Sequence, residues 1–352
     1  MSAAAGAAGG STPSFGAKVP AGALVRPNTA SDDAFVGTAS ESPTQLAISR
    51  LLANKIGMVS LVVLIMIFVV SFSGGWFEQH WAHRTASQQN LSGSVTIGGK
   101  TREVVDIEGM PQISPGFHKQ YMWGADGLGR DVFIRSLRGG SVSLRIGVGA
   151  TMITIILGTL VGMVGGFYGG PTDKALSYVV DIMIAFPFMV FAIGLSSVSS
   201  ASGHLGPLSA GSLWIPTILL GWFAAFGFSR IIRANARELG EKEYVEAARA
   251  LGANDRRIMF LHVLPHLFPT IITYAGIILS GSILGEAGLS FLGIGVQPPI
   301  PSWGNMIADG QAFYSTAWWI AGGGGLMVML TVLSANLFGE AVEEAFDHKG
   351  SR

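Results

Sequence analysis

Cysteine is absent from the 352-residue sequence, so disulfides, thiolate metal sites and a cysteine nucleophile are excluded. Charge is scarce as well, because 12% of the residues are charged, against about 25% in an ordinary soluble domain. The seven histidines show no metal-ligand spacing such as HExxH. The formal net charge of zero identifies no partner by itself, and we expect neither a metal site nor a nucleic-acid partner.

What the sequence has in abundance is apolar residues, which make up 49% of the chain, and glycines, of which there are 49. Several uncharged runs approach the roughly 20 residues that a helix needs to cross a bilayer. We therefore predict an all-α polytopic membrane protein with six transmembrane helices, at about 56–77, 146–172, 176–195, 213–228, 267–284 and 318–338.

Composition divides the chain into five regions. The first is rich in Ala, Gly, Ser, Thr and Pro and lacks an apolar run of signal-peptide length, so we expect a disordered tail without an assignable role. The regions are a disordered cytosolic tail (1–50), the first membrane helix (51–77), an extracytoplasmic loop region (78–141), a five-helix core (142–339) with a cytosolic loop at 233–265, and a charged cytosolic tail (340–352).

The loop region contains a β-hairpin pattern at 94–105, where apolar and polar residues alternate around two glycines. Gly99, Lys100 and Thr101 imitate the end of a phosphate-binding loop. That loop, G-x-x-x-x-G-K-[ST], needs its first glycine at position 94, which is Ser94. We therefore expect no nucleotide site in this chain.

A glycine-rich turn at 124–131 precedes a short amphipathic segment, 132–137, which we expect to lie at the membrane face. Arg130 stands beside Asp126 and Asp131, and local ion pairing among them is the simplest interpretation. Such pairs contribute little where they are exposed.

The charged stretch 242–269 lies between two apolar runs and predicts a helix–turn–helix. A first helix at 244–251 should end at Gly252, and Asn254 or Asp255 should cap a second helix at 256–264. Pro265 and Pro269 suit the entry to a third helix. A solvated amphipathic loop is the alternative. Small residues give the first helix a face that another surface can approach closely: Ala247, Ala248 and Ala250.

One ionisable residue falls within a predicted span, where charge is costly and points to function, and a second lies just past the end of another span. Asp181 either lines a translocation path or sits near the cytosolic end and pairs with Lys174 or a backbone donor. Glu286, near the outer end of the fifth span, either faces a substrate path or bonds to loop amides. Pro187 should kink the third span.

The distribution of basic residues predicts the orientation. The loops at 196–212 and 293–317 contain no Lys or Arg, whereas 230–257 contains seven. The charged stretch is therefore expected to be cytosolic, and with six spans both termini are cytosolic as well.

Three motifs resemble one family. Glu246-Ala247-Ala248, then Gly252 and the run HVLP at 262–265, resembles the EAA loop of ABC importer permeases, although His262 stands where isoleucine is usual. The run at 124–133 resembles the GxDxxGRDVFSR segment of dipeptide and oligopeptide permeases, with Gly127 as a departure. The run at 285–304 resembles their EAxLSFLGxGxxPPxPSWG stretch.

The resemblance covers about residues 55–349 and implies a C-type permease subunit of a dipeptide/oligopeptide (or nickel) ABC importer with type I architecture. It implies a bacterial cytoplasmic membrane location, a homologous B-type permease, two cytosolic ATPases, an external substrate-binding protein and no cofactor in this chain, since ATP and Mg belong to the partners. By this likeness the ATPase-coupling residues are Tyr244, Glu246, Ala247, Ala248, Ala250, Leu251, Gly252, Leu264 and Pro265.

Other residues follow from the same likeness. The candidate contacts with the binding protein are Asp126, Gly129, Arg130, Asp131, Pro299 and Trp303, and the candidate translocation-path residues are Asp181, Pro187 and Glu286. The glycine run 322–325 departs from the pattern and predicts a less rigid sixth helix.

Two other classes remain as alternatives. A stand-alone secondary transporter would show inverted repeats or helices broken at mid-membrane, and a membrane enzyme would show a clustered catalytic set. The sequence shows neither, and the substrate stays open among peptides, nickel and another small solute.

Overall fold

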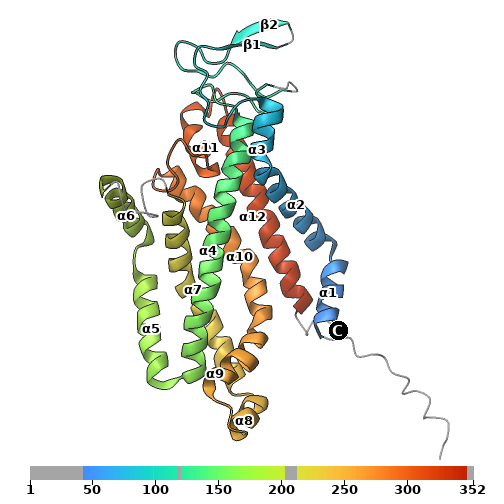
Figure 1. Cartoon of the computed structure of the whole chain (residues 1–352), viewed down its shortest axis with the longest axis vertical. Helices are drawn as coiled ribbons and strands as arrows, with labels where there is room; N and C mark the ends of the chain where they lie inside the picture. The colour runs from blue at the N-terminus through green and yellow to red at the C-terminus, as the bar shows by residue number, and fades with distance from the viewer. Residues whose placement is uncertain (1–42, 98, 117–119, 203–211, 347–352) are drawn as a thin grey trace, which may run out of the picture. The chain divides into compact units, whose positions relative to one another are not determined.

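The computed structural model describes residues 43–97, 99–116, 120–202 and 212–346 (Figure 1). The predicted tail lies outside the described residues over 1–42, as does the end of the second tail over 347–352. Residues 43–50, however, belong to helix α1 (Pro43–Ala53), so the predicted disorder up to residue 50 is wrong there.

The described chain is mostly helical and has five helices that are long and apolar enough to cross a membrane, or six if a bent pair counts as one span. The prediction of an all-α protein with six spans is thus confirmed. The spans are α2 (Lys55–Phe72), α4 (Val132–Tyr168), the pair α5 (Gly170–Ala185) and α6 (Phe188–Ser202), α7 (Trp214–Gly240), α10 (Leu264–Phe291) and α12 (Trp319–Phe346).

Helix α4 is a single helix of 37 residues, and the separate amphipathic helix predicted at 132–137 is wrong. No breaker lies between the two predicted segments, and Gly139 and Gly140 serve close packing instead. A Cβ at Gly140 would come within 2.7 Å of the Trp303 ring, and one at Gly139 within 3.1 Å of Ser302. The helix begins at Asp131, whose side chain accepts hydrogen bonds from the amides of Phe133 and Ile134.

The second and third helices of the charged stretch also form one continuous apolar unit, Asp255–Phe291, rather than two helices. It consists of α9 (Asp255–Ile258), the π-helical turn η4 (Met259–Val263) and α10. Pro265 lies in the first turn of α10 and Pro269 inside it. We attribute the continuity to the wide π turn, which accommodates the ring and the missing N–H of the proline that follows it.

Pro187 does more than kink the third span. Helices α5 and α6 meet at a 75° bend, with Phe186 in an extended conformation between them. The residue before a proline avoids the helical region, which explains the break. Helix α6 extends to Ser202, so the loop predicted from 196 begins too early, and 203–211 lie outside the described residues.

Helix α12 passes through the glycine run without a break and ends at Phe346, beyond the predicted limit of 338. Gly324 lies against α11 (Trp303–Asp309), where a Cβ would come within 2.6 Å of the Trp303 carbonyl oxygen. Gly323 and Gly324 therefore permit close helix packing, and the helix is continuous through the run.

One end of the molecule carries the loop region, with α3 (Gly74–Phe77), the π turn η2 (Glu78–Ala82), α11 and the 3₁₀ turn η5 (Gln311–Phe313) (Figure 1). Strands β1 (Ser94–Ile97) and β2 (Lys100–Glu103) form the predicted hairpin, with Ile97 opposite Lys100. A small apolar core supports it, formed by Val95, Val104, Val105, Ile113, Tyr121 and Ala125.

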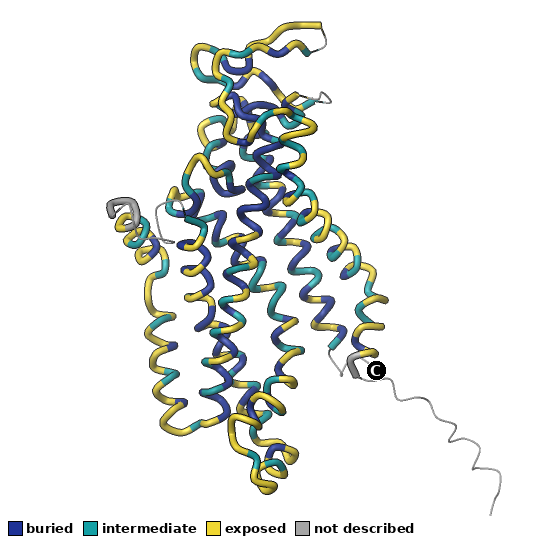
Figure 2. Tube along the Cα trace, viewed as in Figure 1, coloured by how far each residue is buried: buried dark blue, intermediate teal, exposed yellow. Residues whose placement is uncertain are grey.

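Burial divides the helices into two groups (Figure 2). Helices α4, α7, α10 and α12 contribute most of the buried residues of the bundle, and α4 packs extensively on α7. Helix α5 has only Asp173 and Val180 buried. Apolar side chains that a soluble protein would bury are exposed on α2, α5 and α6, as expected for surfaces that lipid or a membrane partner covers.

Candidate functional site

The helix–turn–helix knuckle, residues 243–258, forms the end of the molecule opposite the loop region (Figure 1). Helix α8 (Glu243–Ala250) ends at Gly252, whose φ of 83° falls where glycine is favoured. The amide of Gly252 donates to Arg249 O (2.9 Å) and that of Ala253 to Ala248 O (3.0 Å), which closes the helix end. Asn254 then caps α9 through the Arg257 amide (2.8 Å). The predicted helix, stop and cap are therefore present.

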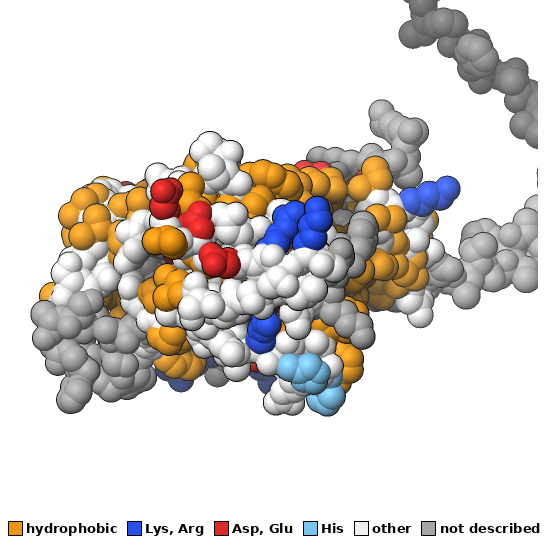
Figure 3. All heavy atoms as spheres, turned by 90° about the horizontal axis from the view of Figure 1, so that it is seen from above, with side chains coloured by type: hydrophobic (Ala, Val, Ile, Leu, Met, Phe, Trp, Pro, Cys, Tyr) orange, Lys and Arg blue, Asp and Glu red, His pale blue; other side chains and the backbone are white. Residues whose placement is uncertain are grey.

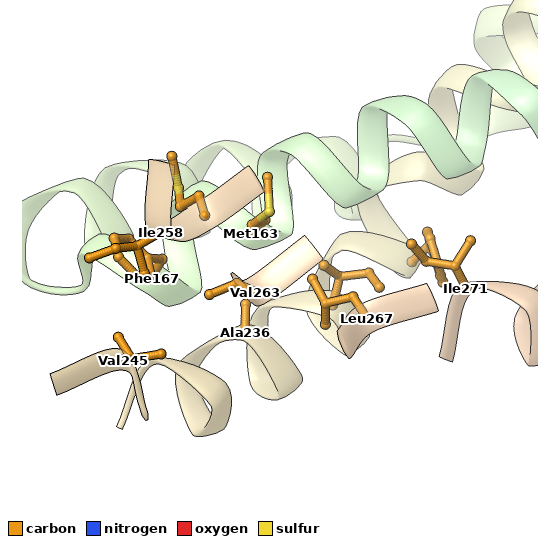
Figure 4. Packing of buried hydrophobic residues seen from close by; sticks show 11 residues of the cluster. Met163, Phe167, Ala236, Val245, Ile258, Val263, Leu267 and Ile271 are labelled. Carbon is orange, nitrogen blue, oxygen red and sulfur yellow. The ribbon is translucent and has the colours of Figure 1, made fainter. Parts of the chain in front are cut away.

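One buried side chain fixes α8 to the bundle. Val245 is fully buried in an apolar cluster that joins α4, α7 and α10 near the knuckle, and Figure 4 shows it beside this cluster. The other members are Met163, Phe167, Phe228, Ile232, Ala236, Ile258, Met259, Val263, Leu267 and Ile271. Val245 therefore packs α8 directly against residues of three membrane helices.

Two ring contacts hold α8 on either side of Val245. Tyr244 stacks on His266 of α10, with ring centroids 5.2 Å apart. The Arg249 guanidinium lies 5.1 Å from the ring centroid of Phe167 on α4. Neither partner was predicted, because His266 and Phe167 are far from these positions along the sequence.

The opposite face of α8 has no cover within the described chain. Glu246, Ala247 and Ala250 are exposed, and Leu251 is 89% exposed at the tip. Ala248, by contrast, packs against the buried cluster, so its predicted place on the approachable face is wrong. Leu264 packs inward as well, while Pro265 is exposed. Leu251 is thus the most prominent apolar contact that the knuckle offers.

A charge cluster joins the start of α5 to α7. Asp173, at the start of α5, bonds to Arg233 (Nε to Oδ1, 2.5 Å) and to Arg237, both on α7. The Asp173 side chain is only 8% exposed. The sequence did not single out Asp173, because its two partners lie 60 and 64 positions away.

A second buried cluster ties the loop region to the bundle. Asp126 binds Arg130 (Nε to Oδ2, 2.6 Å), and Arg130 also reaches Asp309 of α11 (2.8 Å). Arg135 of α4 joins Asp309 (2.8 Å) and lies 3.5 Å from Asp126. Arg130 and Asp126 pair as predicted, but they are buried, and the predicted pairing of Arg130 with Asp131 is absent.

Four of the predicted contacts with a binding protein point inward. Trp303 is fully buried, and its Nε1 donates to the Ser136 carbonyl (2.9 Å). Asp126, Arg130 and Asp131 are buried as well, so none of the four offers an open side chain. Pro299 is exposed.

Asp131 and Gly129 are set by backbone geometry. The carboxylate of Asp131 caps α4 and accepts the Tyr121 amide (3.1 Å). Burial raises the pKa of Asp131, while the amides of Ile134, Tyr121 and Phe133 oppose that rise. Gly129 has a φ of 70°, and a Cβ there would lie 2.2 Å from the Asn90 carbonyl oxygen.

The predicted path residues have unexpected partners. Asp181 pairs with Arg230 of α7 at 2.6 Å, rather than with Lys174 or a backbone donor. Glu286 is fully buried, so it faces no open path in this chain. It accepts from Ser290 Oγ (2.7 Å), and Ser290 in turn accepts the Val296 amide (3.1 Å), so a serine stands between Glu286 and the loop.

Comparison with known proteins assigns these features. A family described as "binding-protein-dependent transport system inner membrane component" matches residues 154–351, and the "N-terminal TM domain of oligopeptide transport permease C" matches 42–92. The chain belongs to the binding-protein-dependent permease family. The membership predicted from the motifs is thereby confirmed, and this chain is a membrane component of an ABC importer.

Similar curated proteins match the permease over most of its length. A putative peptide transport system permease protein of Brucella abortus is 31% identical over 87% of this chain and 92% of its own. The oligopeptide transport system permease protein OppC of Haemophilus influenzae is 30% identical over 85% and 86%. The dipeptide transport system permease protein DppC of Alkalihalophilus pseudofirmus is 30% identical over 88% and 90%.

Among solved structures, an inward-facing form of the MetNI methionine ABC transporter is similar with a TM-score of 0.49 and 18% identity. The match covers 61% of the chain described here and 97% of the MetNI chain. At that score the likeness adds nothing to the family assignment.

Changing Gly252 should disable the knuckle of the permease. Gly252→Pro removes the N–H that donates to Arg249 O and forces φ to about −65°. We expect transport by the complex to fall at least tenfold while the permease still inserts in the membrane, because the change lies outside the spans. Gly99→Pro in the hairpin turn is the matched control at another positive φ. Unchanged transport by Gly252→Pro would contradict the role of this turn.

The Glu286 site of the permease should depend on hydrogen bonding rather than charge. The hydroxyls of Ser143 and Ser302 also face this carboxyl group, and its Oε2 has no hydrogen-bond partner among the described residues. Glu286→Gln keeps an acceptor for Ser290, so thermal stability should stay close to that of wild type. Glu286→Leu leaves buried hydroxyls unpaired and should cost about 1–3 kcal/mol. An equal loss of thermal stability in both variants would show that the charge of Glu286 itself stabilises the fold.

Proposed function

We propose that the chain is the permease subunit of an ATP-driven importer that carries di- or oligopeptides across the bacterial inner membrane. The substrate proposal is supported by its relatives, which include oligopeptide and dipeptide transport permeases. The main structural support for an ATP-driven permease is the knuckle, which has an exposed apolar tip and a buried connection to three membrane helices.

The exposed face of α8 fits the role of a coupling helix that rests on a cytosolic ATPase. Leu251 and the small residues Ala247 and Ala250 provide apolar surface, and Glu246 adds one charge at its edge. Val245 carries motion inward, because it is packed without free space among α4, α7 and α10. In this proposal a homologous permease and two ATPases complete the complex, and ATP and Mg bind only to those ATPases.

The orientation proposal places the knuckle and both termini in the cytosol. Seven basic residues between 230 and 257 support it under the positive-inside rule. The loop region then lies outside, where a substrate-binding protein docks. Figure 3 shows this end with small separate groups of acidic and basic side chains, so docking would not depend on a field of one sign.

Burial reduces the number of candidate contacts with the binding protein. Pro299 and its exposed neighbours Pro298 and Ile300 remain available to a binding protein. The buried set Asp126, Arg130 and Trp303 would instead hold this surface in place from below.

The test is uptake by the reconstituted complex in vesicles. We expect accumulation of a labelled dipeptide or oligopeptide that requires both ATP and the binding protein. Accumulation of nickel without peptide uptake would show that the substrate is nickel rather than a peptide. Uptake without ATP would instead favour a stand-alone secondary transporter and would overturn the proposal.

A further inference from the structure

The ion pair between Asp181 and Arg230 differs from the other inter-helix ion pairs of the described chain. It joins α5 to α7 through a single contact of 2.6 Å, and the two side chains are 59% and 52% exposed. Within the described residues neither side chain has another ionic partner. The nearby Asp173 pairs are the opposite case, because that carboxylate is buried and shared by two arginines.

The depth of this pair makes a lipid-facing position costly. Asp181 lies 11 residues after the start of α5, about 16 Å along the helix axis, and Arg230 lies 10 residues before the end of α7, about 15 Å. Both charges therefore lie well inside their spans, away from the start of α5 and the end of α7. An arginine can extend toward the interface, but the short aspartate side chain cannot. Such residues normally face a watery cavity or another protein group.

The pair also sits beside a break and a cleft. Asp181 precedes the bend at Phe186 and Pro187 by less than two helical turns, so it ties the arm that can pivot there to α7. A small cleft borders the pair, lined by Val161, Gly165, Leu176 and Ser177. In a water-filled path a single exposed ion pair contributes little to stability, so there it can open at small cost.

We propose that Asp181 and Arg230 line the translocation path and exchange their mutual contact for the charged ends of a passing peptide. The peptide ammonium group then binds Asp181, and its carboxylate binds the planar guanidinium of Arg230. This inference rests on the proposed function, since a free peptide has both groups.

Because the natural chain lacks cysteine, one introduced thiol reports on the path without background. Gly227 lies one helical turn before Arg230, is exposed, and has open space where a Cβ would be. In inside-out vesicles containing the full complex, Gly227→Cys should react with a charged, water-soluble thiol reagent at least tenfold faster than Val62→Cys. Val62 is an exposed apolar residue of α2 that we expect to face lipid, so it serves as the control position without water access.

The chemistry is tested with one peptide in two forms. A free dipeptide at millimolar concentration should slow labelling of Gly227→Cys, and the same peptide with acetylated amine and amidated carboxylate should not. Equal protection by both forms would overturn recognition of the termini, and equally slow labelling of both cysteines would overturn the path assignment.

A transport measurement separates recognition from a structural role. Asp181→Asn should raise the KM for the free peptide roughly tenfold, the value of one hydrogen bond to a charged group, with little change in kcat. A purely structural tie would instead lower kcat for every substrate and would contradict the inference. If the wild-type complex takes up no peptide at all, the proposed function fails. The labelling rates of the two cysteines do not depend on peptide uptake, so they test the path assignment separately.

Discussion

Replacing Leu251 with glutamate is expected to separate the permease from its ATPase while leaving its fold intact. Leu251 is 89% exposed, so the substitution removes no internal contact of consequence. Burying a leucine at an interface contributes about 1.5–3 kcal/mol, and a carboxylate in its place adds a desolvation cost. We expect association with the ATPase to weaken roughly 10- to 100-fold, measured by co-purification at graded ATPase concentrations.

The matched control is Leu91→Glu, the same exchange at an exposed leucine of the loop region. It should leave ATPase binding unchanged, because it lies at the opposite end of the molecule. If Leu251→Glu bound the ATPase as well as the wild type did, the knuckle would not be the docking surface.

Removing the Asp126 carboxylate is expected to cause the largest loss of stability. Asp126→Ala leaves Arg130 and Arg135 buried with Asp309 as their one remaining acid, and it frees the amides of Leu128 and Arg130. Breaking a buried charge network in this way costs about 3–5 kcal/mol. Thermal unfolding of the purified complex in detergent should show a clearly lower transition for the variant.

The control for this effect is Glu238→Ala, which breaks an exposed pair with Lys242 near the knuckle. We expect no measurable change in its unfolding temperature, because exposed pairs are screened by solvent. A similar unfolding temperature for Asp126→Ala and Glu238→Ala would mean that the buried charge network contributes nothing to stability.

Local signals in the sequence were sufficient for the knuckle. Gly252 and Asn254 act within a few residues, so their roles as helix stop and cap could be predicted from spacing alone. The hairpin at 94–103 was predictable for the same reason, since its alternation and glycines are contiguous. The family motifs then indicated what the knuckle is for.

Contacts between distant segments could not be predicted in this way. Arg135 and Asp309 are separated by 174 positions, and Asp181 and Arg230 by 49. Nothing near either residue marks its partner. Trp303 shows the same limit, because a motif suggested an outer surface whereas helix packing places the ring against Ser136 inside the bundle. Helix ends were misjudged where glycines that serve close packing resembled breakers, as at Gly139 and Gly140.

The central claim is that this chain works as one subunit of an ATP-driven complex, held to its ATPase by the knuckle. The most direct test is purification of the native chain in mild detergent, followed by mass spectrometry of the proteins that accompany it. The claim predicts an ATPase and a second six-helix permease with the wild type, and loss of the ATPase alone with Leu251→Glu. A chain that purifies alone and still moves solute into vesicles without ATP would contradict it.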